Sequence, residues 1–271
     1  MHGGDVRANI ALTVGGAGAN TAAWLAHSGV ETVLVARVGD DVAGRRASEE
    51  LTTAGVRCAF TIDPAAATCC VVVLVDDEGQ RSMLPDRGAM KNLAPADLDL
   101  ALLRDARHLH LAGYVLLDAS SREAGLAMLA AARDAGLTTS VDPQAAALIT
   151  DPAAFMEEVA GVDVLLPNLD ELAALTGSRD PASAAGLLDT VGAVAVTTGP
   201  AGASWVDRDG IVSVPAAPGE CVDSTGAGDA FDAGLLAARM AGKAPEDCLL
   251  AGVRLGALAV GQVGAQPVSR R

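Results

Sequence analysis

The chain has 271 residues, a formal net charge of −15 and only 2% aromatic residues, so its core must be aliphatic. A chain of this length can fold as one α/β domain, and its acidic balance argues against a nucleic-acid-binding surface. No apolar run reaches the ~18 residues of a membrane span, and no secretion signal opens the chain. The five cysteines are odd in number and lack Cys-x-x-Cys spacing, so we expect a reduced, cytoplasmic protein.

Hydrophobic periodicity predicts strands that alternate with amphipathic helices over most of the chain, which indicates a mainly parallel sheet with helices on both faces. One region, residues 58–84, breaks the alternation, because its consecutive strands follow each other without a helix between them. In chain order we expect a helix over 22–28, strands over 32–38, 68–75 and 80–84, a helix over 98–104, a strand over 108–111, a helix over 122–135, a strand over 138–141, a helix over 154–160, a strand over 162–166, helices over 170–175 and 182–190, strands over 193–197, 203–206 and 211–214, and helices over 229–241 and about 246–260.

A glycine-rich turn runs directly into an apolar helix near residue 229. The amides of Gly226, Ala227 and Gly228 would lie at the helix N-terminus without intrahelical partners, and such amides bind phosphate. Asp229 would occupy the first turn, close enough to a bound phosphate to accept a proton from an attacking hydroxyl. Taken alone, the segment could also be a tight turn in which Asp229 only favours the helix dipole.

A second glycine-rich stretch, Gly15-Gly16-Ala17-Gly18-Ala19-Asn20, lies far upstream. Together the two segments resemble the PfkB carbohydrate kinases, the ribokinase-like family, whose motifs read G-G-x-x-x-N upstream and D-T-x-G-A-G-D or close to it downstream. Residues 167–171 match the N-x-x-E element of the family, 197–202 its T-x-G-x-x-G element, and 264–267 its usual terminal stretch. No P-loop motif occurs, and the dinucleotide-binding fingerprint is incomplete.

The resemblance implies an α/β fold, a ribokinase-like three-layer αβα sandwich with a mainly parallel sheet, in a single kinase domain over residues 1–271. A small β-sheet lid is expected at roughly residues 1–14 and 56–90, and family members often dimerise through it, so a homodimer is possible. Members normally carry a strand and a sugar-binding aspartate well before the Gly-Gly motif, whereas fourteen residues precede Gly15. We therefore expect a truncated chain whose sheet lacks a central strand and whose site lacks one sugar ligand.

The implied reaction is ATP-dependent phosphorylation of a primary hydroxyl on a small sugar or sugar-like substrate. Asp229 would act as general base, while the amides of Gly226, Ala227 and Gly228 stabilise charge on the transferring group. The alternative is a catalytically idle, N-terminally truncated member that binds nucleotide or sugar.

Substrate identity is open between sugars, including fructose-type ones, and nucleosides. Asp142 ends a predicted strand at the carboxyl edge of the sheet, the usual side for ligands. Ala17 stands where ribokinases have lysine, which weakens a ribose assignment, and Arg87 could be a solvated loop residue instead of a ligand to a carboxylate or hydroxyl. The expected substrate-binding residues are Gly16, Ala17, Asn20, Arg87 and Asp142.

The same resemblance implies that two ions, Mg²⁺ and K⁺, take part. Asn168 and Glu171 would organise Mg²⁺ through water, because magnesium keeps much of its hydration shell, although an Asn-x-x-Glu at a helix start can be only a cap. Asp223 and Thr225, with Gly264 in the facing loop, make K⁺ activation plausible, although Asp223 could equally be a turn former. The expected nucleotide-binding residues are Asn168, Thr197, Gly199 and Gly202.

Overall fold

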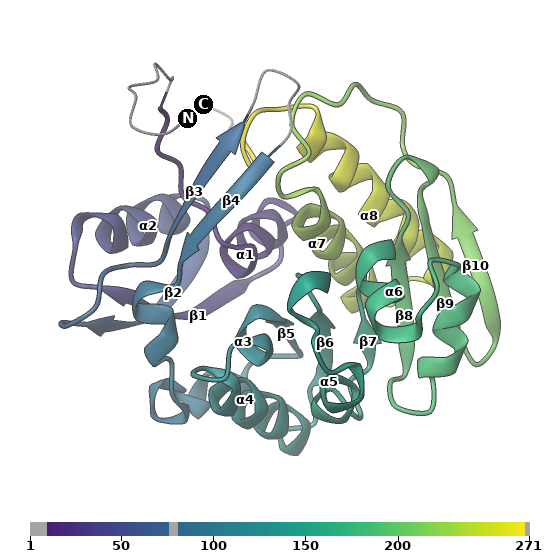
Figure 1. The fold of residues 1–271 in the computed structure, drawn as a ribbon, viewed down its shortest axis with the longest axis horizontal. Coiled ribbons are helices and arrows are strands. Elements are labelled where there is room, and N and C mark those ends of the chain that lie inside the picture. Colours follow the sequence, from purple (N-terminus) through teal and green to yellow (C-terminus); the bar gives the residue numbers. More distant parts are fainter. Residues whose placement is uncertain (1–9, 76–80, 269–271) are drawn as a thin grey trace.

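The computed structural model describes residues 10–75 and 81–268, and Figure 1 shows their arrangement. Helices and strands alternate over most of this part of the chain. The strands are β1 (Thr32–Gly39), β2 (Val56–Asp63), β3 (Cys70–Val75), β4 (Arg81–Asp86), β5 (His108–Ala112), β6 (Thr138–Asp142), β7 (Val164–Leu165), β8 (Ala193–Thr197), β9 (Ala203–Asp207) and β10 (Gly210–Val214). The α-helices are α1 (Ala17–His27), α2 (Val42–Thr53), α3 (Tyr114–Leu117), α4 (Arg122–Asp134), α5 (Pro152–Glu158), α6 (Leu169–Thr176), α7 (Ala227–Met240) and α8 (Pro245–Val260).

The largest sheet has six strands in the order β10-β9-β8-β7-β6-β5. Strands β5 to β8 run parallel, and β9 and β10 complete the sheet as an antiparallel hairpin. Strands β1 and β2 form a separate parallel pair, joined by the crossover helix α2 that parallel neighbours require. In the described part of the chain, the sheet is therefore mainly parallel, as predicted, but divided into separate hydrogen-bonded units.

Two hydrophobic cores lie on opposite faces of the six-stranded sheet. Along β8, Ala193 and Ala195 pack with α1, α7 and α8, while Val194 and Val196 pack with α3, α4, α5 and α6. This alternation is expected where both faces of a strand are buried, because successive side chains point to opposite faces. The same division is visible in Figure 1, where α7 and α8 lie on the other side of the sheet from α4 and α5. The molecule is thus the predicted three-layer αβα sandwich.

Three predicted helices differ from the observed ones. Helix α1 begins at Ala17 rather than at residue 22, because Gly16 takes a φ of 98° as its N-cap and the amide of Asn20 already donates to the Gly16 carbonyl. The segments predicted as helices over 98–104 and 182–190 form 3₁₀ helices at Leu100–Arg104 and Pro181–Leu187. Both are short and begin after an aspartate cap, as is common for 3₁₀ turns that connect longer elements.

The region of the expected lid forms a two-stranded antiparallel ribbon in which Cys70 lies opposite Asp86. Residues Val56–Asp63 differ from the prediction, since they form β2 and pair with β1 instead of joining the ribbon. Residues 1–9, most of the N-terminal part of the expected lid, lie outside the described residues. Large apolar side chains of the ribbon are exposed, namely Val71, Val72, Val73, Leu74, Met83 and Leu84.

No helix between residues 10 and 75 or between 81 and 268 has the length and apolar character needed to cross a membrane.

Candidate active site

The predicted anion-binding turn lies at the N-terminus of α7. Gly226 is the N-cap with a φ of 75°, and a Cβ on it would lie 2.7 Å from the Cβ of Ala265, so only glycine fits there. A Cβ on Gly228, one residue into the helix, would meet nothing within 4 Å. The amide of Ala227 donates to the Ser224 carbonyl at 3.4 Å, a long turn contact. The turn thus presents accessible backbone at the positive end of a 14-residue helix.

Asp229 lies in the first turn of α7 and is 9% exposed. Its Oδ2 accepts a hydrogen bond of 2.8 Å from the side-chain amide of Asn20. Burial raises the pKa of Asp229 to about 6, while hydrogen bonds from Asn20 and Gln144 act in the opposite direction. A carboxylate with this pKa is ionised at neutral pH and remains basic enough to take a proton.

Asn20 brings α1 to this site from more than 200 residues away in the sequence. Its Oδ1 accepts from the side-chain amide of Gln266 at 3.3 Å, and the indole of Trp24, one turn later, donates to the Ala265 carbonyl at 2.9 Å. Both glycine-rich segments and the C-terminal stretch therefore meet at one place. Gly16 caps α1, with Ala17 as the first helical residue, and a Cβ on Gly16 would meet nothing within 4 Å.

Asp142 ends β6 and is buried beneath the same site. Its Oδ1 accepts from the Gln144 amide at 2.9 Å, and its Oδ2 accepts from the Gln144 side chain. Asp232, one turn after Asp229 on α7, is 2% exposed and faces the Asp142 carboxyl group. Burial and the neighbouring carboxylates raise the pKa of Asp142 and of Asp232 well above the ordinary value.

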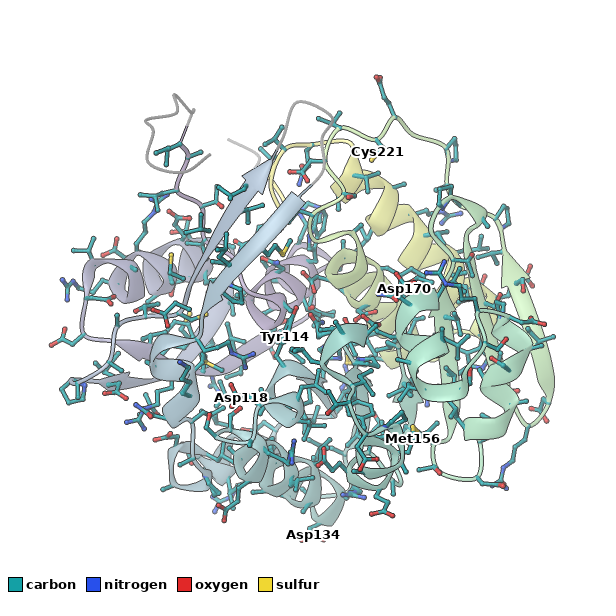
Figure 2. All side chains as sticks on the ribbon, in the orientation of Figure 1. Tyr114, Asp118, Asp134, Met156, Asp170 and Cys221 are labelled. Carbon is teal, nitrogen blue, oxygen red and sulfur yellow. The ribbon has the colours of Figure 1, made fainter. Side chains whose placement is uncertain are left out.

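The guanidinium group of Arg87 lies over the aromatic ring of Tyr114. It lies 5.3 Å from the ring centre, donates to the Tyr114 carbonyl at 3.1 Å and lies 3.9 Å from an oxygen of Asp118. Figure 2 shows Tyr114 near the middle of the molecule, with Asp118 beside it. Burial, and then the charges of Asp142 and Asp229, raise the pKa of Tyr114, which places its phenol within the field of the carboxylates. Arg87 is therefore held in place and is not a freely solvated loop residue.

Asn168 and Glu171 form a capping box at the start of α6. The Asn168 backbone amide donates to Oε2 of Glu171 at 2.9 Å, and its side chain donates to Oε1 at 2.7 Å. Glu171 is 3% exposed, and burial raises its pKa. Because both oxygens already accept hydrogen bonds from Asn168, the pair fits an outer-shell contact to a hydrated Mg²⁺ better than direct ligation.

The predicted nucleotide residues lie at the carboxyl end of β8. Thr197 pairs with Asn168 in an isolated parallel bridge, which places the two segments side by side. After Thr197 the chain turns through Gly199, with a φ of 59°, and Gly202, with a φ of 110°. A Cβ on Gly202 would overlap the Val214 carbonyl, so this turn requires glycine.

Asp223 links the turn before α7 to the C-terminal loop. Its Oδ1 accepts from the Thr225 amide at 2.8 Å, and its Oδ2 accepts from the Gly264 amide at 3.0 Å. Over residues 10–75 and 81–268, no group of three or more His, Cys, Asp or Glu side chains is arranged to hold a metal ion. Both carboxylate oxygens of Asp223 therefore join the turn before α7 to the C-terminal loop.

Two side chains of this site were missed from the sequence, the half-buried Gln144 and the buried Asp232. Asp232 carried a usable signal, because a position three residues after Asp229 on a helix lies on the same face. Gln144 carried none, since its role depends on a left-handed backbone conformation with a φ of 72°.

Comparison with known proteins fits this geometry. A model of the pfkB family carbohydrate kinases matches residues 6–270. The chain belongs to the PfkB family. This PfkB kinase is 34% identical over 253 residues to the ATP-dependent ribose-1-phosphate kinase of Halopiger xanaduensis, with 93% of this chain and 82% of the relative covered.

Solved structures of other kinases are similar to it in fold. The adenosine kinase from Sinorhizobium meliloti gives a TM-score of 0.89 at 26% identity, with 94% of this chain and 80% of that one covered. A putative ribokinase II from E. coli, in complex with ATP and Mg²⁺, gives 0.86 at 26% identity, covering 97% and 88% of the two chains. The predicted ribokinase-like fold is confirmed, and so is the prediction that the protein is an enzyme, an ATP-dependent carbohydrate kinase.

Proposed function

We propose that this PfkB kinase transfers the γ-phosphoryl group of ATP to a primary hydroxyl of a small sugar or sugar-like substrate, with Asp229 as general base. The observation that carries the proposal is the position of Asp229: buried, in the first turn of α7, held by the Asn20 amide and next to the open backbone of Gly228. Base and anion-binding amides are thereby placed within one helical turn.

The chemistry follows from the charge state of Asp229. With a pKa of about 6, roughly nine tenths of the side chain is ionised at pH 7. The carboxylate accepts the hydroxyl proton as the substrate oxygen bonds to phosphorus, and the bond from phosphorus to the ADP oxygen breaks. The amides of Gly226, Ala227 and Gly228 stabilise the charge on the transferring group.

For the substrate, the geometry favours Gly16, Ala17 and Arg87 as contacts. Gly16 offers open backbone at the N-terminus of α1, and Arg87 lies against Tyr114 within the same carboxylate field. Asn20 and Asp142 have their side-chain oxygens and amides engaged with protein groups, so we assign them to holding the site.

For the nucleotide, we propose that Asn168, Thr197, Gly199 and Gly202 line the site. Mg²⁺, which neutralises phosphate charge when bound, would be held through water by Glu171 and Asn168. K⁺ activation through Asp223 and Thr225 is supported only by their place beside the anion-binding turn, where Asp223 already joins two loops.

We further propose that residues 1–271 form one kinase domain, in which the β3–β4 ribbon acts as the lid and as the contact of a homodimer. The exposed valines and leucines of the ribbon support this, because a contiguous apolar patch marks an interaction surface. Light scattering of the purified protein tests the dimer, and a monomer at micromolar concentration overturns it.

The experiment for the reaction is ADP release with Mg²⁺, ATP and K⁺ against ribose, ribose-1-phosphate, fructose, 2-keto-3-deoxygluconate and adenosine. Turnover on one substrate, with ³¹P NMR locating the new phosphate on a primary hydroxyl, supports the proposal. Thermal stabilisation by ATP or a sugar without any ADP would instead identify an idle binding protein.

A further inference from the structure

Gln144 has the only positive φ among the non-glycine residues of the described chain, at 72°. Residues with a Cβ adopt this left-handed conformation rarely, and such residues cluster at functional sites. Gln144 follows β6 in the turn Asp142-Pro143-Gln144, at the carboxyl edge of the sheet. Its backbone amide donates to Oδ1 of Asp142 at 2.9 Å, which fixes the turn on the strand that it leaves.

The side chain of Gln144 lies between two carboxylates. Its Nε2 donates to Oδ2 of Asp142, and its amide also acts on Asp229, whose charged form it favours. A side-chain amide has two N–H donors, so one group can serve both partners. On the other side, Asp232 of α7, which is 2% exposed, brings a second buried carboxyl group next to Asp142.

Amides from two different elements act on Asp229. The Asn20 amide donates to it at 2.8 Å from α1, and the Gln144 amide, in the turn after β6, favours its charged form. Two donors on separate elements restrict the rotation of a carboxylate, while its remaining lone pairs stay available to a hydroxyl.

We propose that Gln144 is a positioning residue for the base, whose side-chain amide bridges Asp142 and Asp229 and holds the Asp229 carboxylate in the orientation that receives the substrate proton. This rests on the proposed function, in which Asp229 is the base. Gln144 itself need not touch the substrate.

The groups that act on Asp229 come from several elements. The Gln144 and Asn20 amides favour its charged form, whereas burial opposes it. Removing the Gln144 amide should raise the pKa of Asp229 further above its value of about 6. The ionisable groups in the same field are Asp142 on β6, Glu171 on α6, Asp232 on α7 and Tyr114 on α3.

Two variants separate the amide from the backbone. Gln144→Met removes both donors and keeps the side-chain length, and Gln144→Gly removes the donors but relieves the left-handed backbone. We expect both to lower kcat by about 10- to 100-fold, with KM for ATP within about twofold of the wild-type value. If Gln144 served only the backbone turn, Gln144→Gly would keep full activity, and that result overturns the proposal.

A titration that needs no turnover gives the second readout. The ¹³C signal of the Asp229 carboxyl group, assigned by its loss in Asp229→Asn, reports the pKa directly in the wild type and in Gln144→Met. We expect an upward shift in the variant, and an unchanged pKa overturns the proposal. This measurement does not depend on catalysis. If the wild type turned over none of the substrates, the proposed function would be rejected, and the titration would still test whether Gln144 acts on Asp229.

Discussion

The two glycines that flank Ala227 should respond in opposite ways to the same methyl group. In Gly226→Ala the new residue would keep a φ of 75° and place its Cβ 2.7 Å from the Cβ and carbonyl oxygen of Ala265. The left-handed backbone costs about 1 to 2 kcal/mol, and the overlap adds about 1 to 3 kcal/mol. The free energy of unfolding should therefore fall by about 2 to 5 kcal/mol.

Gly228→Ala is the matched control for stability. Its Cβ meets nothing within 4 Å, and the residue lies inside α7, where alanine is favoured over glycine by about 0.5 to 1 kcal/mol. Helical Cβ atoms tilt towards the helix N-terminus, so the methyl group would enter the space where the transferring phosphoryl group meets the amides. We expect an unchanged or slightly higher Tm together with a loss of at least about tenfold in kcat.

Thermal unfolding and steady-state ADP release, measured on both variants, check this pair. About 1 kcal/mol corresponds to about 2 to 4 °C in Tm for a domain near this size. The reasoning is refuted if Gly228→Ala retains full kcat, since the turn would then not face the reacting phosphate. It is also refuted if the Tm of Gly226→Ala equals that of the wild type.

Three further outcomes follow from the structure. Because the base must be deprotonated and burial raises the pKa of Asp229 to about 6, kcat should fall about tenfold per pH unit below pH 6 and level off above it; a rate that increases towards acid contradicts this. Gly202→Ala should lower the free energy of unfolding by about 2 to 4 kcal/mol, because its Cβ would overlap a backbone carbonyl and its φ is 110°. Gly186→Ala is the control and should keep its stability, because its Cβ would meet nothing within 4 Å. Equal urea midpoints for the two variants would contradict this difference. Asp223→Ala leaves two backbone amides without their acceptor, so unfolding should become easier by about 1 to 3 kcal/mol and any K⁺ dependence of kcat should weaken; an unchanged K⁺ titration rejects the cation site.

The strands of the six-stranded sheet could be predicted from the sequence, because they are short segments with strand-favouring residues between recognisable helices and turns. The strand predicted over 108–111 is β5, and the one predicted over 193–197 is β8 with the same limits. Asp229 was also placed correctly, since a glycine turn before an apolar helix has few structural interpretations. These features depend on local chemistry, and the sequence carries local chemistry directly.

Other features depend on contacts between residues far apart in the sequence, so they could not be predicted from short sequence segments. Helix α1 includes Gly18, which is unfavourable in a helix, so local propensity favours a later start for the helix than the structure has. The contact of Gln144 with Asp142 depends on the left-handed backbone of a three-residue turn, and its proposed contact with Asp229 depends on where α7 lies. No periodicity in the sequence encodes either arrangement.

The most direct test of the central claim compares kcat of the wild type and Asp229→Asn on the substrate that the panel identifies. The variant should stay folded at pH 8, because burial disfavours the charged form of Asp229 and a neutral amide of the same size does not carry that cost. We expect kcat to fall by about 10² to 10⁴ while the Tm is kept. A folded Asp229→Asn protein that turns over within a few-fold of the wild type would contradict the assignment of Asp229 as the base.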